Sequence, residues 1–133
     1  IARHQAGFDP RSLVEAGIRP VAGAADLHAA REAAARVEVA PAVMAYLVDI
    51  CRATRTSPAV RLGVSPRGAT ALLRTSRVWA FLQGRGFVTP DDVKTMAPST
   101  LAHRLGLRAE ANLEGITAVN VISGVLAATP VPR

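Results

Sequence analysis

Apolar residues recur along much of the chain at intervals of three and four, the spacing of helices that bury one face. The clearest stripe starts after Ser65-Pro66 and stops at Gly84, and glycine is typical of helix ends. Its members are Ala69, Leu72, Leu73, Ser76, Trp79, Ala80 and Gln83. We predict a helix here, with Trp79 in the core.

Two helices are predicted before this one. Asp26 suits the N-cap of a helix over Leu27–Arg36. Pro41 suits the first turn of a second helix, which ends near Arg55. The apolar stripe of this second helix is Val43, Met44, Leu47, Ile50, Cys51 and Thr54.

Two or three helices are predicted after it. Thr89-Pro90-Asp91-Asp92 supplies a hydroxyl cap, a first-turn proline and first-turn acids, and this helix should run to about Met96. Pro98 permits a short helix through His103. Thr117 caps a last helix whose inward residues are Val121, Ile122, Val125 and Leu126.

Strand signals are short. Val37–Val39 and Phe87–Val88 are β-branched or aromatic and are predicted to pair with each other. Residues 56–64 and 108–115 are predicted to be loops. The sequence therefore predicts an all-α fold, a small helical bundle with at most one minimal two-strand pairing.

Residues 1–25 are rich in glycine and proline and are predicted to form a connecting arm, with one short helix over Pro10–Ala16. Residues 26–133 are then one domain of ordinary size. The chain begins with Ile1 rather than Met, so we expect it to be part of a longer protein. No apolar run approaches the roughly 20 residues that span a bilayer, so no membrane segment is expected.

The net charge is +6, and the one lysine, Lys94, stands among 16 basic residues. Arginine suits flat anions such as phosphates. A nucleotide, a nucleic acid or an acidic protein is therefore a possible partner, and a solvated basic surface explains the charge equally well. A nucleic-acid-binding module is one alternative, and a protein-interaction module is another. Nucleic acid is disfavoured because the arginines are spread along the chain and only 4% of residues are aromatic.

The stretch Ser65-Pro66-Arg67-Gly68 is the strongest candidate site. A cation in the first turn opposes the helix dipole by about 0.3–1 kcal/mol, and glycine inside a helix costs about 1 kcal/mol relative to alanine. Such penalties suggest an anion site formed by backbone N–H groups and the Arg67 guanidinium. The alternative is that Arg67 pairs with a carboxylate and that Gly68 fits a tight helix crossing.

Gly63 and Gly68 have the spacing of the glycines in a phosphate-binding P-loop, but Ala69-Thr70 follows where that motif requires lysine. A P-loop is therefore rejected at this position.

Other polar residues give weaker signals. His4, His28, His103 and Cys51 have no metal-ligand spacing, so no metal site is expected. The lone cysteine is interpreted as a small hydrophobe and excludes an intrachain disulfide. Asp91 and Asp92 are interpreted as first-turn acids rather than catalytic groups. Arg74 shares a helix face with Arg67 and is interpreted as a surface residue or, alternatively, a subunit contact. His103-Arg104 fits an interface or a structural turn.

Four segments, taken in order, resemble the C-terminal helical lid of MoxR-type AAA+ ATPases. Residues 63–73 resemble that family's second sensor motif, residues 84–94 resemble the segment that follows it, and His103-Arg-Leu105 and the Val-Pro-Arg end also match. Together they span most of residues 36–133, and residues 1–30 resemble the stretch that joins the ATPase core to the lid.

The resemblance implies that Arg67 is the sensor arginine, which reaches toward the γ-phosphate of ATP held mainly, with Mg, by the core domain. Ser65, Pro66 and Gly68 would support it. It also implies ring-forming subunits in the cytoplasm, a chaperone-like role, and von Willebrand factor A domain proteins as partners. The family's P-loop, acidic Mg-binding motif and trans-acting arginine belong to the core and are missing here. We therefore expect that the chain alone does not hydrolyse ATP and binds nucleotide weakly.

Overall fold

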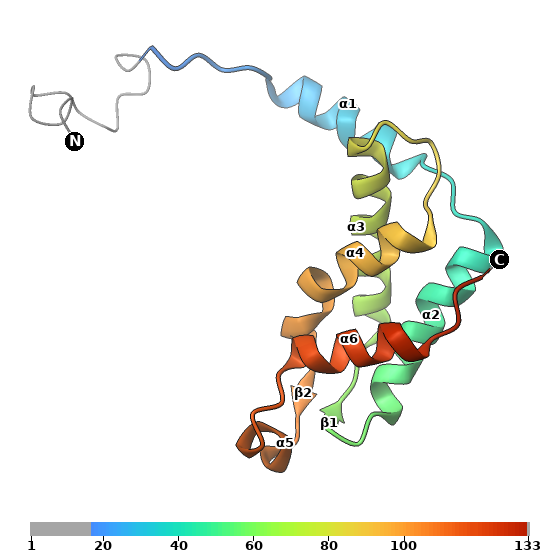
Figure 1. Cartoon of the computed structure of the whole chain (residues 1–133). Coiled ribbons are helices and arrows are strands. Elements are labelled where there is room, and N and C mark those ends of the chain that lie inside the picture. The colour runs from blue at the N-terminus through green and yellow to red at the C-terminus, as the bar shows by residue number, and fades with distance from the viewer. Residues whose placement is uncertain (1–16, 133) are drawn as a thin grey trace, which may run out of the picture. The chain divides into compact units, whose positions relative to one another are not determined.

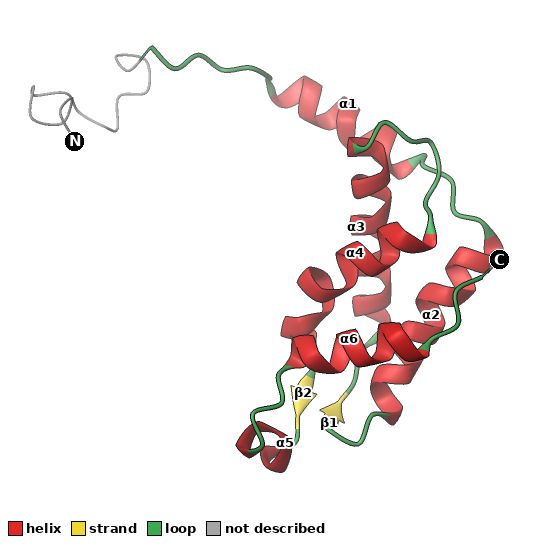
Figure 2. Cartoon of the chain, in the orientation of Figure 1, coloured by secondary structure: helices red, strands yellow, loops and turns green. Residues whose placement is uncertain are grey.

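A computed structural model describes residues 17–132 of the 133-residue chain (Figure 1). The predicted Pro10–Ala16 helix and His4 lie outside the described residues. The helices are α1 (Ala24–Ala35), α2 (Pro41–Thr56), α3 (Pro66–Leu82), α4 (Pro90–Leu101), the 3₁₀ turn η2 (Ala102–Arg104), α5 (Ala109–Leu113) and α6 (Ala118–Ala128). The strands are β1 (Val60–Leu62) and β2 (Gly106–Leu107). Figure 2 shows how far helix dominates the described residues, which confirms the predicted all-α class.

The chain divides into two compact units, Ile1–Ala30 and Arg31–Arg133. Residues 17–29 of the first unit are exposed throughout. The second unit contains α2 to α6 and holds the hydrophobic core. None of the described helices is both long and apolar enough to cross a membrane.

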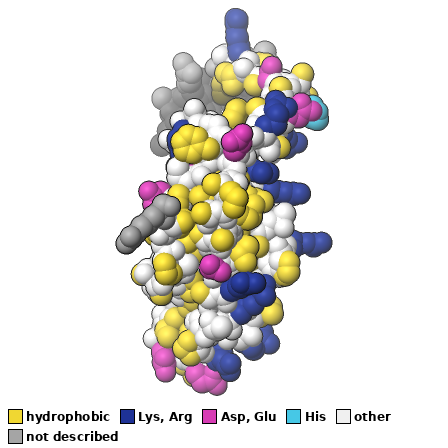
Figure 3. Space-filling view, turned by 90° about the vertical axis from the view of Figure 1, so that its right-hand side faces the viewer, with side chains coloured by type: hydrophobic (Ala, Val, Ile, Leu, Met, Phe, Trp, Pro, Cys, Tyr) yellow, Lys and Arg dark blue, Asp and Glu magenta, His cyan; other side chains and the backbone are white. Residues whose placement is uncertain are grey.

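The core of the second unit lies between α2, α3, α4 and α6. Its largest side chains with almost no exposed surface include Leu47, Ile50, Leu72, Leu101 and Ile122. Burying each such side chain contributes about 1.5–3 kcal/mol, so the helix faces predicted from spacing are what hold the bundle together. Trp79 is only partly buried, so its predicted place in the core is wrong. Figure 3 shows other hydrophobic side chains interspersed with charged ones over the visible face.

The start signals of four helices are confirmed. Proline occupies the first position of α2, α3 and α4. Thr89 caps α4 and Thr117 caps α6, each by accepting a hydrogen bond from the amide three residues later. Each cap is also reciprocated, because the side chain of that third residue accepts from the backbone amide of the threonine. These caps satisfy amides that would otherwise lack partners.

Other helix boundaries differ from the prediction. α1 begins at Ala24, so Asp26 is not its N-cap; the Asp26 carboxylate instead accepts from the Gly23 amide at 2.8 Å. α4 continues through Pro98 to Leu101. A proline costs one helical hydrogen bond, and here the neighbouring Ala97 and Leu101 are fully buried, so packing keeps the helix going. α5 lies within the predicted loop 108–115, so that prediction is also wrong.

The predicted pairing of residues 37–39 with 87–88 is present as a single parallel bridge. Glu38 donates its amide to the Gly86 carbonyl and accepts from the Val88 amide, both at 2.9 Å. The two-stranded sheet is formed elsewhere, by the antiparallel pair β1 and β2. β1 lies inside the predicted loop 56–64, which corrects that prediction. A three-residue strand is too short to show the alternation of apolar and polar residues that indicates a strand.

Candidate functional site

The start of α3 has the predicted construction. Ser65 is the N-cap with extended backbone angles, and its Oγ accepts from the Gly68 amide at 3.3 Å. The Ser65 carbonyl accepts from the amides of Gly68 and Ala69, at 2.8 and 3.1 Å. Pro66 has no N–H. The amide of Arg67 is thus the one first-turn donor left for a ligand, so this helix end offers less than the several backbone donors expected from the sequence.

Gly68 is buried, and its role is close packing. A Cβ atom at this position would lie 2.6 Å from Val64 Cγ1 and 3.5 Å from Arg104 Cδ. No side chain fits at the first of these distances unless Val64 moves. The structure therefore supports the tight-packing alternative for Gly68, and the group that packs beside it includes the Arg104 side chain.

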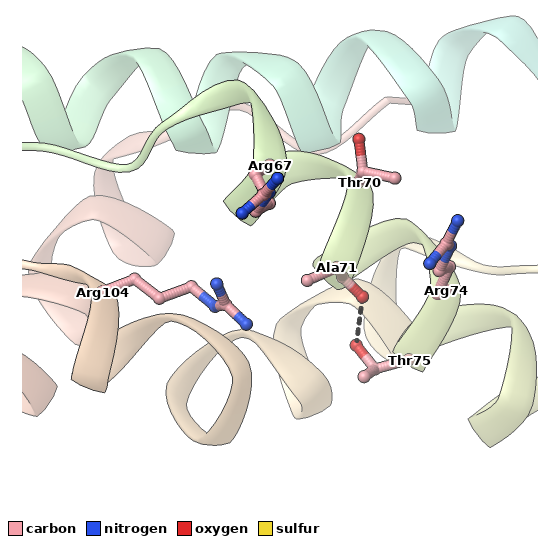
Figure 4. Close-up of a pocket in the computed structure, with 6 residues that line it drawn as sticks. All are labelled: Arg67, Thr70, Ala71, Arg74, Thr75 and Arg104. Atoms are coloured by element: carbon pink, nitrogen blue, oxygen red, sulfur yellow. Dashed lines mark hydrogen bonds between the residues drawn. The ribbon is translucent and has the colours of Figure 1, made fainter.

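Arg67 lies at the edge of an open pocket (Figure 4). The pocket is lined by Arg67, Thr70, Ala71, Arg74, Thr75 and Arg104. Arg67 is exposed, and no carboxylate within residues 17–132 forms an ion pair with it. The alternative in which a permanent acidic partner holds Arg67 is therefore not what the described structure shows.

Arg104 is the site residue that sequence reasoning did not assign. It is in η2, directly after α4, and its Nε donates to the Thr100 carbonyl at 3.1 Å. Thr100 Oγ1 in turn lies 2.9 Å from Thr75 Oγ1 on α3. The end of α4 thus lies beside the middle of α3, and Arg104, which follows it, lies beside Gly68 at the start of α3, so the two helices run antiparallel. A short connection between two helices predicts such a hairpin, and this signal could have placed Arg104 beside Arg67.

Arg74 lines the same pocket from α3, two turns after Arg67. It is exposed and belongs to the same helix face, as predicted. The sequence left two interpretations of Arg74, a solvated surface residue and a subunit contact. The structure adds a third, in which Arg74 forms part of the pocket.

The opposite end of the α3–α4 hairpin contains a different arrangement. Arg85 Nη1 donates to Asp92 Oδ2 at 2.6 Å, and Asp92 also accepts from the Thr89 amide and hydroxyl. The Arg85 hydrogen bond, followed by the Thr89 bonds, holds the pKa of Asp92 below its ordinary range. Asp92 is a first-turn acid, as predicted, and its buried position makes it a structural residue.

Cys51 lies away from the pocket beside Arg67. Cys51 is buried, and burial raises the pKa of its thiol to about 11, so it is a protonated hydrophobe at neutral pH. Within residues 17–132 no three metal-ligating side chains come together.

The fold is that of a helical lid of the AAA type. The AAA lid domain family matches residues 52–125, and the chain belongs to this family. It is a lid of the MoxR type. The chain is 35% identical to MoxR of Methylorubrum extorquens and 32% identical to chaperone MoxR1 of Mycobacterium tuberculosis, over 80% and 81% of its length.

Two further similarities agree with this assignment. Protein YeaC of Bacillus subtilis is 37% identical over 86% of the chain. The 2.00 Å crystal structure of a candidate ATPase from Cytophaga hutchinsonii superposes with a TM-score of 0.72, at 26% identity over 77% of the chain and 34% of that protein. The chain spans 36% of YeaC, 36% of MoxR and 31% of MoxR1, so it corresponds to about a third of these relatives.

Proposed function

We propose that this lid belongs to an ATP-hydrolysing MoxR-type ATPase, and that Arg67 contacts the γ-phosphate of ATP bound mainly by the core domain. The observation that carries the proposal is an exposed guanidinium at the start of α3, over a pocket with two more arginines. Within the described residues no acid neutralises it. Such a group is available to stabilise phosphate charge.

The predicted site residues have different tasks in this proposal. Ser65 and Pro66 fix where α3 begins, and Gly68 lets Val64 and Arg104 pack against the first turn. Arg67 supplies the ligand contact through its side chain and its free amide. A hydrogen bond to a charged group contributes about 1.5–3 kcal/mol, so one arginine modulates the binding of Mg-ATP while the core domain provides most of it.

The wider assembly follows from the same proposal. Residues 1–25 are the arm that joins the ATPase core to the lid, and residues 26–133 are the lid itself. The lid moves relative to the core as ATP binds and is hydrolysed, and it passes the nucleotide state to neighbouring subunits of a cytoplasmic ring. A chaperone-like role is supported by the name of MoxR1. Von Willebrand factor A domain proteins are the proposed partners.

The test is Arg67→Ala in the full-length protein. We expect ATP turnover to fall by about tenfold to a hundredfold, because a lost charged hydrogen bond of about 1.5–3 kcal/mol corresponds to roughly that range. Steady-state hydrolysis across a range of ATP concentrations measures it. The 133-residue chain alone is expected to show no hydrolysis above background.

The matched control is Arg52→Ala. Arg52 is on α2, its side chain is 74% exposed, and it forms a loose 3.8 Å pair with Asp49. It is not among the residues that line the pocket, so its loss should leave turnover unchanged. Normal turnover by Arg67→Ala at all ATP concentrations would refute the sensing role.

A further inference from the structure

A second arginine reaches the pocket from the other helix of the hairpin. Figure 4 shows the Arg104 side chain extending from η2 into the space beside α3, below Arg67 and beside Thr75. The pocket has a volume of about 620 Å³, within the range of small-molecule sites. Arg67 and Arg104 thus approach one cavity from opposite walls.

The Arg104 side chain is held in place at Cδ and Nε. Nε donates to the Thr100 carbonyl at 3.1 Å, and Cδ packs next to the open side of Gly68. Thr100 is itself tied to Thr75 across the two helices. Because the stem and Nε are held, the guanidinium loses little conformational freedom when it binds a ligand.

The terminal nitrogens of Arg104 remain available. Its location after the C-terminus of α4 suits the helix dipole, and this explains the bond from Nε. The helix dipole does not account for the position of Nη1 and Nη2. These two nitrogens donate to no partner among residues 17–132. A guanidinium fork of this kind matches phosphate oxygens in a bidentate contact.

Charge in the pocket points to the same chemistry. Arg67, Arg74 and Arg104 line it without any aspartate or glutamate. The described ion pairs of the second unit lie elsewhere, between Arg52 and Asp49, Arg85 and Asp92, and Lys94 and Asp91. Three like charges around a cavity repel one another unless an anion enters. Two opposed arginines suit an anion with more than one charged group.

We infer that Arg104 is a second phosphate-binding residue of this lid and contacts the same polyphosphate chain as Arg67. The inference rests on the proposed function for the identity of the ligand, a nucleoside triphosphate. Arg104 anchors the anion from the α4 side while Arg67 contacts it from the start of α3. Both helices of the α3–α4 hairpin thereby contribute an arginine to the same ligand.

The experiment measures equilibrium binding of Mg-AMP-PNP, a non-hydrolysable ATP analogue, to the full-length protein. Arg104→Met removes the guanidinium but retains a long apolar stem beside Gly68. We expect its dissociation constant to rise at least about tenfold, since the charged contact between the guanidinium and the phosphate is lost. Arg104→Lys should recover part of the affinity, because it restores the charge without the fork. Arg52→Met is the length-matched control and should bind normally.

The outcomes separate this inference from the sensing role of Arg67. Weak binding by Arg104→Met with partial rescue by lysine supports the inference, whatever Arg67→Ala does. If Arg67→Ala impairs turnover while Arg104→Met binds AMP-PNP normally, this inference is wrong and the sensing role stands. If Arg104→Met and Arg104→Lys are destabilised in urea but bind normally, Arg104 is only a structural residue and the inference is likewise overturned.

Discussion

The two ends of the α3–α4 hairpin use arginine in opposite ways. Near the connecting loop, Arg85 donates to Asp92, which is 3% exposed and also accepts from the amide of Thr89, the N-cap of α4. At the far end, Arg67 and Arg104 face an open pocket with no acid. An arginine neutralised within the chain holds the hairpin together, and an arginine without a counter-charge is available to a ligand. The presence or absence of a carboxylate separates the two roles.

The largest expected effect comes from removing the acid at the paired end. Asp92→Ala deletes a buried carboxylate that accepts from Arg85 and from the amide and hydroxyl of Thr89. We expect the free energy of unfolding to fall by about 2–3 kcal/mol, because a capping interaction and a charged hydrogen bond disappear together. Urea denaturation of the 133-residue chain measures the loss.

Asp91→Ala is the adjacent control. Its carboxylate side chain is 85% exposed and pairs with Lys94 on the surface. Exposed pairs contribute at most about 1 kcal/mol, so this variant should remain close to the wild-type chain. Equal destabilisation by the two variants would show that the paired end is not special.

The second prediction concerns pH at the same end. The folded chain holds the pKa of Asp92 below its ordinary value, through the Arg85 hydrogen bond first and the Thr89 bonds after it. An unperturbed aspartate titrates near about 3.9. The stabilisation by Asp92 is therefore complete above that pH and is lost as the pH falls through the lower, folded-state pKa.

The measurement compares the wild-type chain with Asp92→Ala by urea denaturation from pH 7 to pH 2.5. The difference in unfolding free energy between them should be constant down to about pH 4 and shrink below it. Other acids contribute to both chains and cancel. A difference that stays constant to the lowest pH would contradict the depressed pKa.

The starts of four helices were predictable because their signals are local. Proline at the first position marks the start of α2, α3 and α4, and a threonine N-cap marks the start of α4 and α6. Where tertiary packing overrides local preference, prediction fails. α4 passes through Pro98 because the buried residues around it outweigh one lost hydrogen bond, and β1 is too short to show a period.

The site was half predictable for a related reason. Ser65, Pro66 and Arg67 are consecutive, so their arrangement can be read from the order of residues alone. Arg104 is 37 positions later than Arg67 and reaches the pocket only because α3 and α4 run antiparallel. The order of the helices indicates that Arg104 lies near Arg67. The residue types of His103-Arg104 do not indicate it.

The smallest change in stability is expected when an acidic residue is introduced into the pocket that Arg67 and Arg104 line. Thr70 is exposed, lines the pocket and is four residues before Arg74. Thr70→Glu places a carboxylate within helical reach of Arg74 and Arg67, and such pairs contribute about 0.2–0.5 kcal/mol each. The unfolding free energy should therefore rise by a few tenths of a kcal/mol, measured in urea at low salt.

The same change should impair the ligand site. A glutamate in the pocket supplies the counter-charge that phosphate would supply, so the dissociation constant for Mg-AMP-PNP in the full-length protein should rise about tenfold. Thr70→Gln has the same length without the charge and should bind normally. If Thr70→Glu binds AMP-PNP as tightly as the glutamine variant, the arginines at the open end do not hold the anion. The contrast between the two ends would then be one of exposure alone.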